Sequence, residues 1–187
     1  MKVLVIHPKD ITTDFLITAY NQDFTIVRTE LSNSTLKSLI KQHDVIVMMG
    51  HGDRYGLYGH GRYIIDSSDV AELRNKICIC VWCYAYKFVE KYGLNSPFCT
   101  DMFISEEEEA DFEGIDLLKD KYPNLLYASN IAFAMALQYG FMDMIHKEDG
   151  MEEMINTIGN YYDNNLFDSP LKQYNLERFH SHEIQKN

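Results

Sequence analysis

Two stretches of sequence decide the fold: Asp44-Val-Ile-Val-Met-Met-Gly-His51-Gly52 and Lys76-Ile-Cys-Ile-Cys-Val-Trp-Cys83. Each contains an apolar run of strand length, the pattern typical of inner strands in a parallel sheet. In such sheets, ligands and catalytic groups lie at the carboxyl ends of the strands. A histidine that follows one strand and a cysteine that follows the next are therefore predicted to face one crevice. There Cys83 can act as a nucleophile and His51 as its acid/base partner.

The composition is that of a globular protein with an ample core. The chain has 187 residues, of which 46% are hydrophobic. We expect a single domain over residues 1–187, with the core at 1–162 and a polar extension at 163–187 whose last residues are loosely held. The net charge of −11 argues against a nucleic-acid partner.

The sequence predicts a cytoplasmic protein that has no membrane partner. Met1 and Lys2 lead directly into a short apolar run, which is not the pattern of a secretory signal. The longest apolar stretch, residues 131–145, is interrupted by polar residues and is too short to cross a bilayer. Three of the four cysteines crowd into one strand, which favours reduced thiols over a disulfide framework.

Strands and helices alternate at short spacing, which predicts the α/β class. Strands are expected at residues 2–6, 24–29, 45–49, 77–82 and 100–105, with a small hairpin at 56–65. Helices are expected at residues 14–20, 34–42, 69–75, 131–146 and 151–162, and between Cys83 and the stop signal Gly93. Asp69 and Glu72 fit a capping box. We expect a three-layer α/β/α sandwich with a mostly parallel, flavodoxin-like central sheet.

The two strand ends resemble those of the caspase-like cysteine peptidases, the group of caspases, metacaspases, legumain, gingipains and clostripain. Met49-Gly50-His51-Gly52 is similar to the histidine block of that group, and Val81-Trp82-Cys83 is similar to its cysteine block. Phe103-Ile104-Ser105, with the acidic run after it, resembles the strand that borders the specificity pocket. The resemblance covers roughly residues 1–146.

The resemblance implies a cysteine endopeptidase that acts on peptides or proteins and needs no cofactor and no metal. Cys83 would be the nucleophile and His51 the general acid/base, and the backbone N–H groups of Gly52 and Cys83 would receive the oxyanion. The implied walls of the specificity pocket contain Val81, Trp82, Ser105, Glu106 and Asp111. The carboxylates of the acidic run predict a preference for Arg or Lys before the scissile bond.

The chain also departs from the pattern of that group. The caspase signature Gln-Ala-Cys is absent, and His51 precedes Cys83 by only 83 − 51 = 32 residues. Val81 stands where metacaspases and clostripain have an acidic residue, and the bulky Trp82 stands where a small residue usually precedes the nucleophile. A catalytically silent binding or regulatory module with the same architecture is therefore the alternative function.

Two weaker hypotheses concern other histidines and cysteines. His60, in a second Gly-His-Gly, is expected in the hairpin at the rim of the site and not in catalysis. A metal site built from His51, His60, Cys80 and Cys83 would rest on a single Cys-x-x-Cys pair, which is not the spacing of a structural zinc site. Cys78 and Cys80 are expected in the core.

Overall fold

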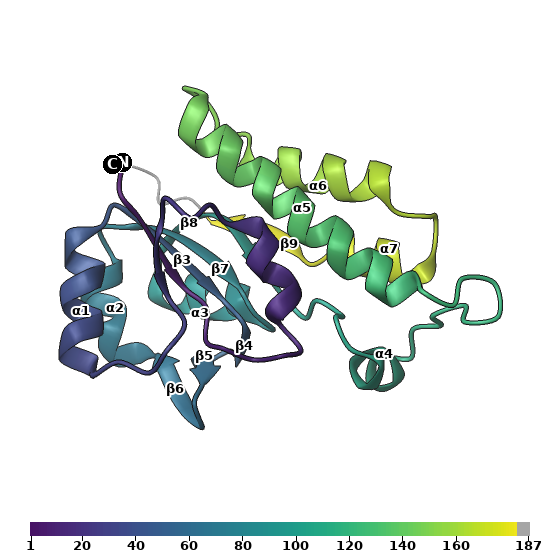
Figure 1. Cartoon of the computed structure of the whole chain (residues 1–187), viewed down its shortest axis with the longest axis horizontal. Helices are drawn as coiled ribbons and strands as arrows, with labels where there is room; N and C mark the ends of the chain where they lie inside the picture. Colours follow the sequence, from purple (N-terminus) through teal and green to yellow (C-terminus); the bar gives the residue numbers. More distant parts are fainter. Residues whose placement is uncertain (183–187) are drawn as a thin grey trace. The chain divides into compact units, whose positions relative to one another are not determined.

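The computed structural model describes residues 1–182 (Figure 1). Its internal contacts divide them into two compact units. The first unit comprises Met1–Thr13, Asn21–Asp101 and the chain from His180. The second comprises Asp14–Tyr20 and Met102–Phe179. The single-domain organisation expected from the sequence stays a prediction.

The first unit is built on a mixed, mostly parallel sheet of six strands in the order β2-β1-β3-β7-β8-β9. These strands are β1 (Val3–Ile6), β2 (Thr25–Val27), β3 (Val45–Met49), β7 (Ile77–Val81), β8 (Asn95–Thr100) and β9 (Phe179–His182). Neighbouring strands from β2 to β8 pair in parallel. The predicted α/β class is thereby confirmed.

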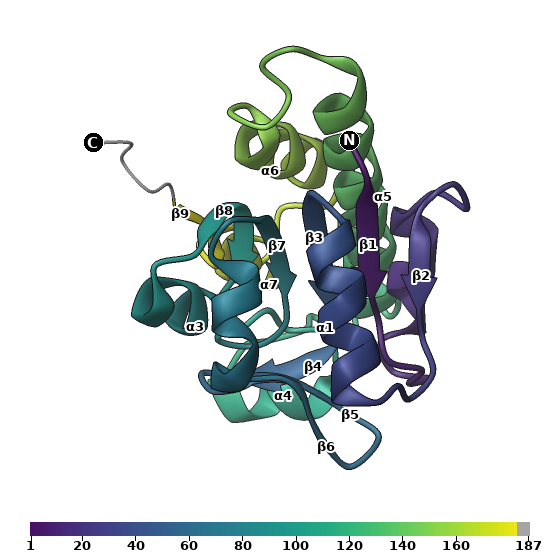
Figure 2. The same ribbon diagram turned by 90° about the vertical axis from the view of Figure 1, so that its left-hand side faces the viewer.

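Three helices of the first unit share a core with one face of the sheet. They are α1 (Asn33–Gln42), α2 (Val70–Leu73), which follows the 3₁₀ turn η2 (Ser67–Asp69), and α3 (Ala85–Tyr92). Alternate side chains of the inner strands, such as Leu4, Ile46 and Cys78, form one buried cluster with Ile40 of α1 and Phe88 of α3. Figure 2 shows α1 lying across β1 and β3. The strand period of two residues explains why every second residue joins this cluster.

Between β3 and β7 the chain forms a separate antiparallel sheet of three strands: β4 (His51–Asp53), β5 (Gly56–Gly59) and β6 (Arg62–Ile65). The predicted hairpin at 56–65 is confirmed, and β4 adds a third strand to it. Its turn has positive φ at His60 (52°) and Gly61 (77°), as a type I′ hairpin turn requires. His60 therefore has a place in the turn, as expected.

The predicted strand at 100–105 is wrong, because β8 ends at Thr100 and residues 101–105 form no strand. The misleading residue is Pro97, which breaks the apolar pattern and cannot donate to a ladder. β8 accommodates Pro97 at a bulge: Ile77 pairs with Asn95, but Ile79 pairs with Phe98.

The capping box predicted for Asp69 and Glu72 is also wrong. Asp66 is the capping residue: its side chain accepts from Ser68 N at 2.7 Å, and Asp69 accepts in return from Asp66 N at 3.1 Å. The pair of Asp66 and Asp69 has the same capping-box spacing as the predicted pair and lies three positions earlier in the chain. The helix consequently starts with a 3₁₀ turn before Val70.

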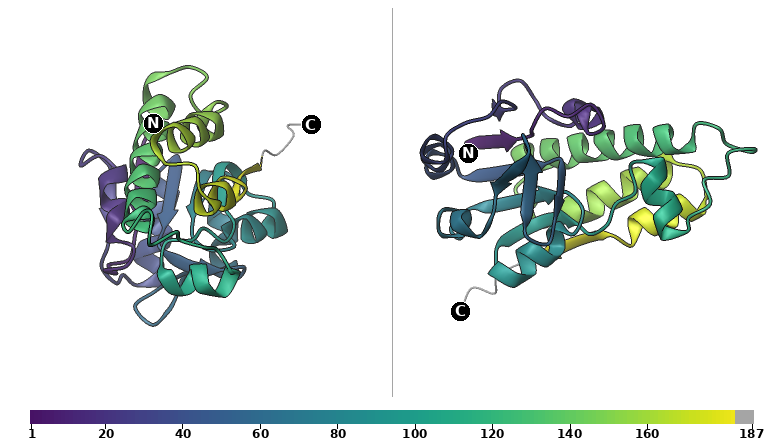
Figure 3. Two further views of the ribbon diagram at one scale, coloured as in Figure 1. Left: turned by 90° about the vertical axis from the view of Figure 1, so that its right-hand side faces the viewer. Right: turned by 90° about the horizontal axis from the view of Figure 1, so that it is seen from below.

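The second unit is helical. It contains η1 (Asp14–Ala19), α4 (Glu107–Glu113), α5 (Leu125–His146), α6 (Met154–Asn165) and α7 (Pro170–Leu176). α5 and α6 lie side by side, as the two views in Figure 3 show. α5 begins six residues earlier than predicted (131 − 125), and the acidic run after Ser105 forms the start of α4.

The polar extension expected from residue 163 contains the end of α6, then α7 and β9. Ser169 caps α7 by accepting from Lys172 N at 3.1 Å, and Pro170 occupies the first helical turn, where its missing N–H costs nothing. Leu171 and Asn175 of this helix are fully buried. Residues 183–187 lie outside the described part of the chain.

Among residues 1–182, α5 is the one helix long and apolar enough to cross a membrane by length and composition. Half of its most apolar segment is buried inside the protein, and one such helix is weak evidence for a membrane span.

Candidate functional site

The carboxyl edge of the first unit's sheet brings the two predicted motifs together. β3 and β7 are direct parallel neighbours, with Met49 paired to Val81, and Gly50 N donates to Val81 O at 3.0 Å. His51 and Cys83 each follow these paired residues by two positions. The prediction that the two strands are parallel neighbours is confirmed, and both reactive residues leave the sheet at the same edge.

His51 is held by the loop that follows β1. Its side chain is 36% exposed, and its Nε2 lies 2.6 Å from Thr12 Oγ1 and 3.9 Å from Asp10 Oδ1. Thr12 in turn donates to Asp10 Oδ1 through its backbone N at 3.0 Å and through Oγ1 at 2.9 Å. The imidazole therefore contacts a threonine that a carboxylate fixes in place.

Asp10 supplies a negative charge beside this imidazole. The hydrogen bond from the Thr12 backbone N–H lowers the pKa of the Asp10 carboxyl, and the side chain of Thr12 and the nearby His51 act in the same direction. Asp10 is consequently ionised at neutral pH, and its negative charge lies beside the imidazole. The sequence interpretation missed Asp10 and Thr12. The sequence did contain a signal for them, because Asp10 and Thr12 follow the first predicted strand, and loops after parallel strands lie at the carboxyl edge of the sheet.

Cys83 lies in a strained turn between β7 and α3. Ala85 N donates to Trp82 O at 3.1 Å across this turn, and Tyr84 has φ 63° and ψ 23°. That is the third position of a type II turn, where glycine is usual. Strain of this kind tends to persist where the surrounding structure fixes the backbone, as it does at many active sites.

The orientation of the Cys83 backbone N–H follows from the Trp82 carbonyl. This carbonyl accepts from Ala85 N and from the buried Thr100 Oγ1, the latter at 2.9 Å, so it points toward Thr100. In a trans peptide the N–H points opposite to the C=O. The Cys83 N–H is therefore directed away from buried Thr100, as a donor to an oxyanion must be.

Cys83 differs in burial from the other three cysteines. All four are free thiols, but Cys78, Cys80 and Cys99 are fully buried and Cys83 is only partly buried. Burial raises the pKa of the Cys78 and Cys99 thiols to about 12 and raises the pKa of Cys80 well above its usual value. Cys80 is part of the core cluster, so it is not available to a metal site with Cys83. Within residues 1–182, no group of three or more His, Cys, Asp or Glu side chains is placed to hold a metal ion.

The contacts of Trp82 explain why a bulky residue precedes Cys83. Its indole N–H donates to Asp53 O at 3.0 Å, which ties β4 to the end of β7. A Cβ at Gly52 would overlap the indole ring, so only glycine allows β4 to approach Trp82 this closely. Trp82 thus joins the histidine block to the cysteine block.

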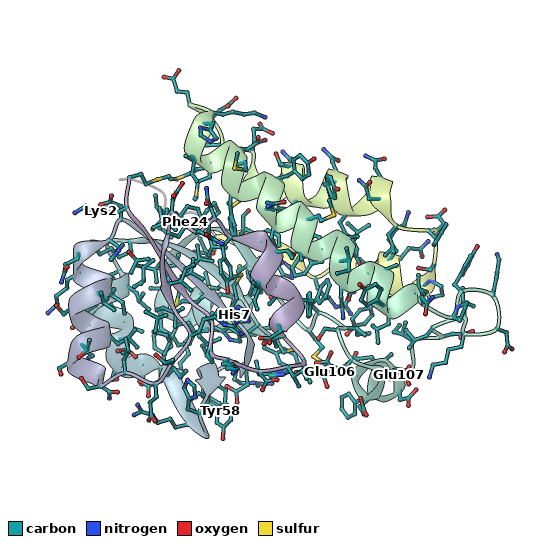
Figure 4. All side chains as sticks on the ribbon, viewed as in Figure 1. Lys2, His7, Phe24, Tyr58, Glu106 and Glu107 are labelled. Carbon is teal, nitrogen blue, oxygen red and sulfur yellow. The ribbon has the colours of Figure 1, made fainter. Side chains whose placement is uncertain are left out.

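The residues predicted for a specificity pocket are divided between the two units. In the first unit, Val81 and Trp82 are buried, with 4% and 2% exposure. In the second unit, Ser105 donates its N and Oγ to Glu109 Oε2, and Glu106 forms a capping box with Glu109 at the start of α4. Figure 4 labels Glu106 and Glu107 there. Asp111 is exposed on α4.

The sequence matches no protein-family model, and no curated protein matches it. Function is therefore inferred from the residues at the carboxyl edge alone.

Proposed function

We propose that this protein is a cysteine endopeptidase with a caspase-like, three-layer α/β/α architecture. Cys83 is its nucleophile and His51 its general acid/base. The observation that carries the proposal is the parallel pairing of Met49 with Val81. Because His51 and Cys83 each come two residues after this pair, they leave neighbouring strands at the same sheet edge. The partial burial of Cys83, beside three fully buried cysteines, supports the assignment.

The reaction follows from the chemistry of the two groups. The Cys83 thiolate attacks the peptide carbonyl carbon, and the carbonyl oxygen becomes an oxyanion that accepts from the N–H groups of Gly52 and Cys83. Protonated His51 gives its proton to the leaving amine, and a thioester remains on Cys83. Neutral His51 then takes a proton from water, whose oxygen attacks the thioester, and the C–S bond breaks to release the carboxylic acid and restore the Cys83 thiolate.

Asp10 and Thr12 are positioning residues in this mechanism. The hydrogen bond between Thr12 Oγ1 and His51 Nε2 limits rotation of the imidazole, and Asp10 fixes Thr12 in place through two hydrogen bonds. Their role is the one that a third residue has in other nucleophile–base pairs. Because a reduced thiol is required, the expected location is the cytoplasm.

The expected substrates are peptides or proteins with Arg or Lys before the scissile bond. Three carboxylates of the acidic run have local partners: Glu106 and Glu109 share a capping box, and Glu107 pairs with Lys119 at 2.7 Å. Glu108 and Asp111, in the second unit, are exposed. Peptides that differ only in the residue before the scissile bond test this preference, and cleavage after Asp would contradict it.

The decisive experiment compares two histidines. Wild-type protein, His51→Ala and His60→Ala are incubated with a peptide mixture, and the products are separated by chromatography. We expect cleavage by the wild type and by His60→Ala, whose side chain comes from the other Gly-His-Gly. We expect none by His51→Ala or Cys83→Ala. Equal loss in both histidine variants, or cleavage that survives Cys83→Ala, would refute the mechanism.

A catalytically silent binding module is the second candidate, and one observation favours it. Trp82 packs against Gly52, the glycine past which a substrate carbonyl would approach. If wild-type protein with reduced thiols cleaves no peptide and Cys83 reacts no faster with iodoacetamide than a free cysteine does, the silent module is the better description.

A further inference from the structure

The three-stranded sheet β4–β5–β6 carries a row of side chains that begins at His51. In its register His51 pairs with Tyr58, and Tyr58 pairs with Tyr63. Directly opposed residues of antiparallel strands project from the same face of a sheet. His51, Tyr58 and Tyr63 therefore line one face, and Figure 4 labels Tyr58 in the strand pair β5–β6.

The two tyrosines are exposed and hold a defined arrangement. Tyr58 is 45% exposed and Tyr63 is 38% exposed. Their ring centroids lie 5.8 Å apart, with the ring planes at 85°. Exposed aromatic rings that are already ordered lose little conformational entropy on binding a ligand.

A carboxylate completes this face. Asp53 is two residues from His51 in β4, so its side chain projects in the same direction. Asp53 Oδ2 accepts from Tyr63 OH at 2.7 Å, and Oδ1 accepts from Tyr55 N at 2.7 Å. The bond to Asp53 also raises the pKa of Tyr63, so its hydroxyl stays protonated at neutral pH.

We propose that Tyr58, Tyr63 and Asp53 form a binding subsite for the guanidinium group of an arginine side chain in a peptide. That this peptide is also a substrate rests on the proposed peptidase function. The ring of Tyr58 or Tyr63 stacks on the guanidinium, and Asp53 accepts a charge-assisted hydrogen bond from it. The subsite is distinct from the pocket expected for the residue before the scissile bond.

Charge complementarity favours a cation over an anionic or purely apolar ligand. The chain has a net charge of −11, and Asp10 and Asp53 both lie close to His51 along the loop and the strand. The nearby cations already face other tyrosines: Arg54 lies 6.0 Å from the Tyr84 ring centroid and Lys91 lies 5.8 Å from that of Tyr55. Arginine is preferred to lysine because its planar group both stacks and donates in a fork.

The test measures binding separately from cleavage. Cys83→Ala protein is titrated by calorimetry with a seven-residue peptide that has arginine as its one charged side chain, and with the same peptide containing citrulline. Citrulline keeps the shape of arginine and removes its charge. We expect the arginine peptide to bind about tenfold more tightly, the combined effect of a ring contact and a charge-assisted bond.

Substitutions then localise the preference. Added to Cys83→Ala, Tyr58→Phe keeps the ring and should keep the arginine-to-citrulline ratio. Tyr58→Leu and Asp53→Asn should each reduce the ratio about threefold. Circular dichroism checks that each variant is folded, and His60→Ala, in the turn of the same hairpin, is the matched control with an unchanged ratio.

The outcomes separate the two proposals. Equal binding of the two peptides, or a ratio that Tyr58→Leu and Asp53→Asn both leave unchanged, overturns the subsite, even if the wild-type protein cleaves peptides. A ratio that depends on these residues supports the subsite, even if the wild-type protein cleaves neither peptide and the peptidase proposal fails.

Discussion

His51 and Cys83 are fixed by different means. His51 is held by side chains of a neighbouring loop, through Thr12 and Asp10, whereas Cys83 is held by the backbone of its own strained turn. Substitutions near the histidine should therefore change reactivity with little effect on stability. Substitutions in the cysteine turn should change both.

Thr12→Val should slow the reaction of Cys83 with iodoacetamide about fivefold at neutral pH, since it removes one hydrogen bond to the imidazole. The pH profile of the reaction should also shift, which a purely structural effect would not cause. Thr13→Val is the matched control because Thr13 contacts His7 and not His51. Equal slowing in both variants would contradict a positioning role for Thr12.

Native protein should expose one reactive thiol out of four. Because the pKa of Cys78 and Cys99 is raised to about 12, these thiols remain protonated throughout pH 7–9 and react only after unfolding. Thiol titration followed by peptide mapping should find Cys83 labelled first, and His51→Ala should slow that labelling. Labelling of Cys99 ahead of Cys83 would favour the silent module.

Tyr84→Gly should be more stable than Tyr84→Ala by about 1 kcal/mol, because only glycine adopts φ near 63° without strain. Both variants lose the ring that faces Arg54, so that contact cancels in the comparison. Denaturant titration measures the difference. A more stable alanine variant would mean that the turn relaxes.

At the scale of elements, the sequence is most informative where a pattern is long and uninterrupted. The apolar runs predicted β3 and β7 and their place at the site, because fully buried parallel strands leave no other pattern. The strand predicted at 100–105 lies too late in the chain. Pro97 argued against a strand at 95–100, but in the structure it lies at a bulge that depends on the register with β7. The partnership of Asp10 and Thr12 with His51 spans up to 41 residues (51 − 10), and no local pattern encodes it.

In the second unit, one buried side chain bonds to both backbone groups of a residue in an irregular segment. Asn175 is fully buried, accepts from Ile104 N at 2.9 Å and donates to Ile104 O at 3.1 Å. Its amide also contacts Tyr162 OH at 3.2 Å. Ile104 lies where a strand was expected, and Asn175 takes the place of the missing strand partner.

Asn175→Ala should therefore lower the free energy of unfolding by about 3 kcal/mol, because it leaves two buried backbone groups of Ile104 without partners. Gln173→Ala, an exposed position on the same helix, is the control and should have little effect. Thermal unfolding measures both variants. A cost similar to that of Gln173→Ala would show that water replaces the Asn175 amide.

At the scale of the whole molecule, Trp82 gives the first unit an optical signal of its own. It is the only tryptophan in the chain, it is 2% exposed, and it joins the two motifs of the site. Its emission should be that of a buried indole and should move to longer wavelength when the first unit unfolds. Circular dichroism, in contrast, also detects the helices of the second unit. Coincident transitions by the two signals would establish one cooperative domain, as the sequence predicts, whereas separate midpoints would establish two.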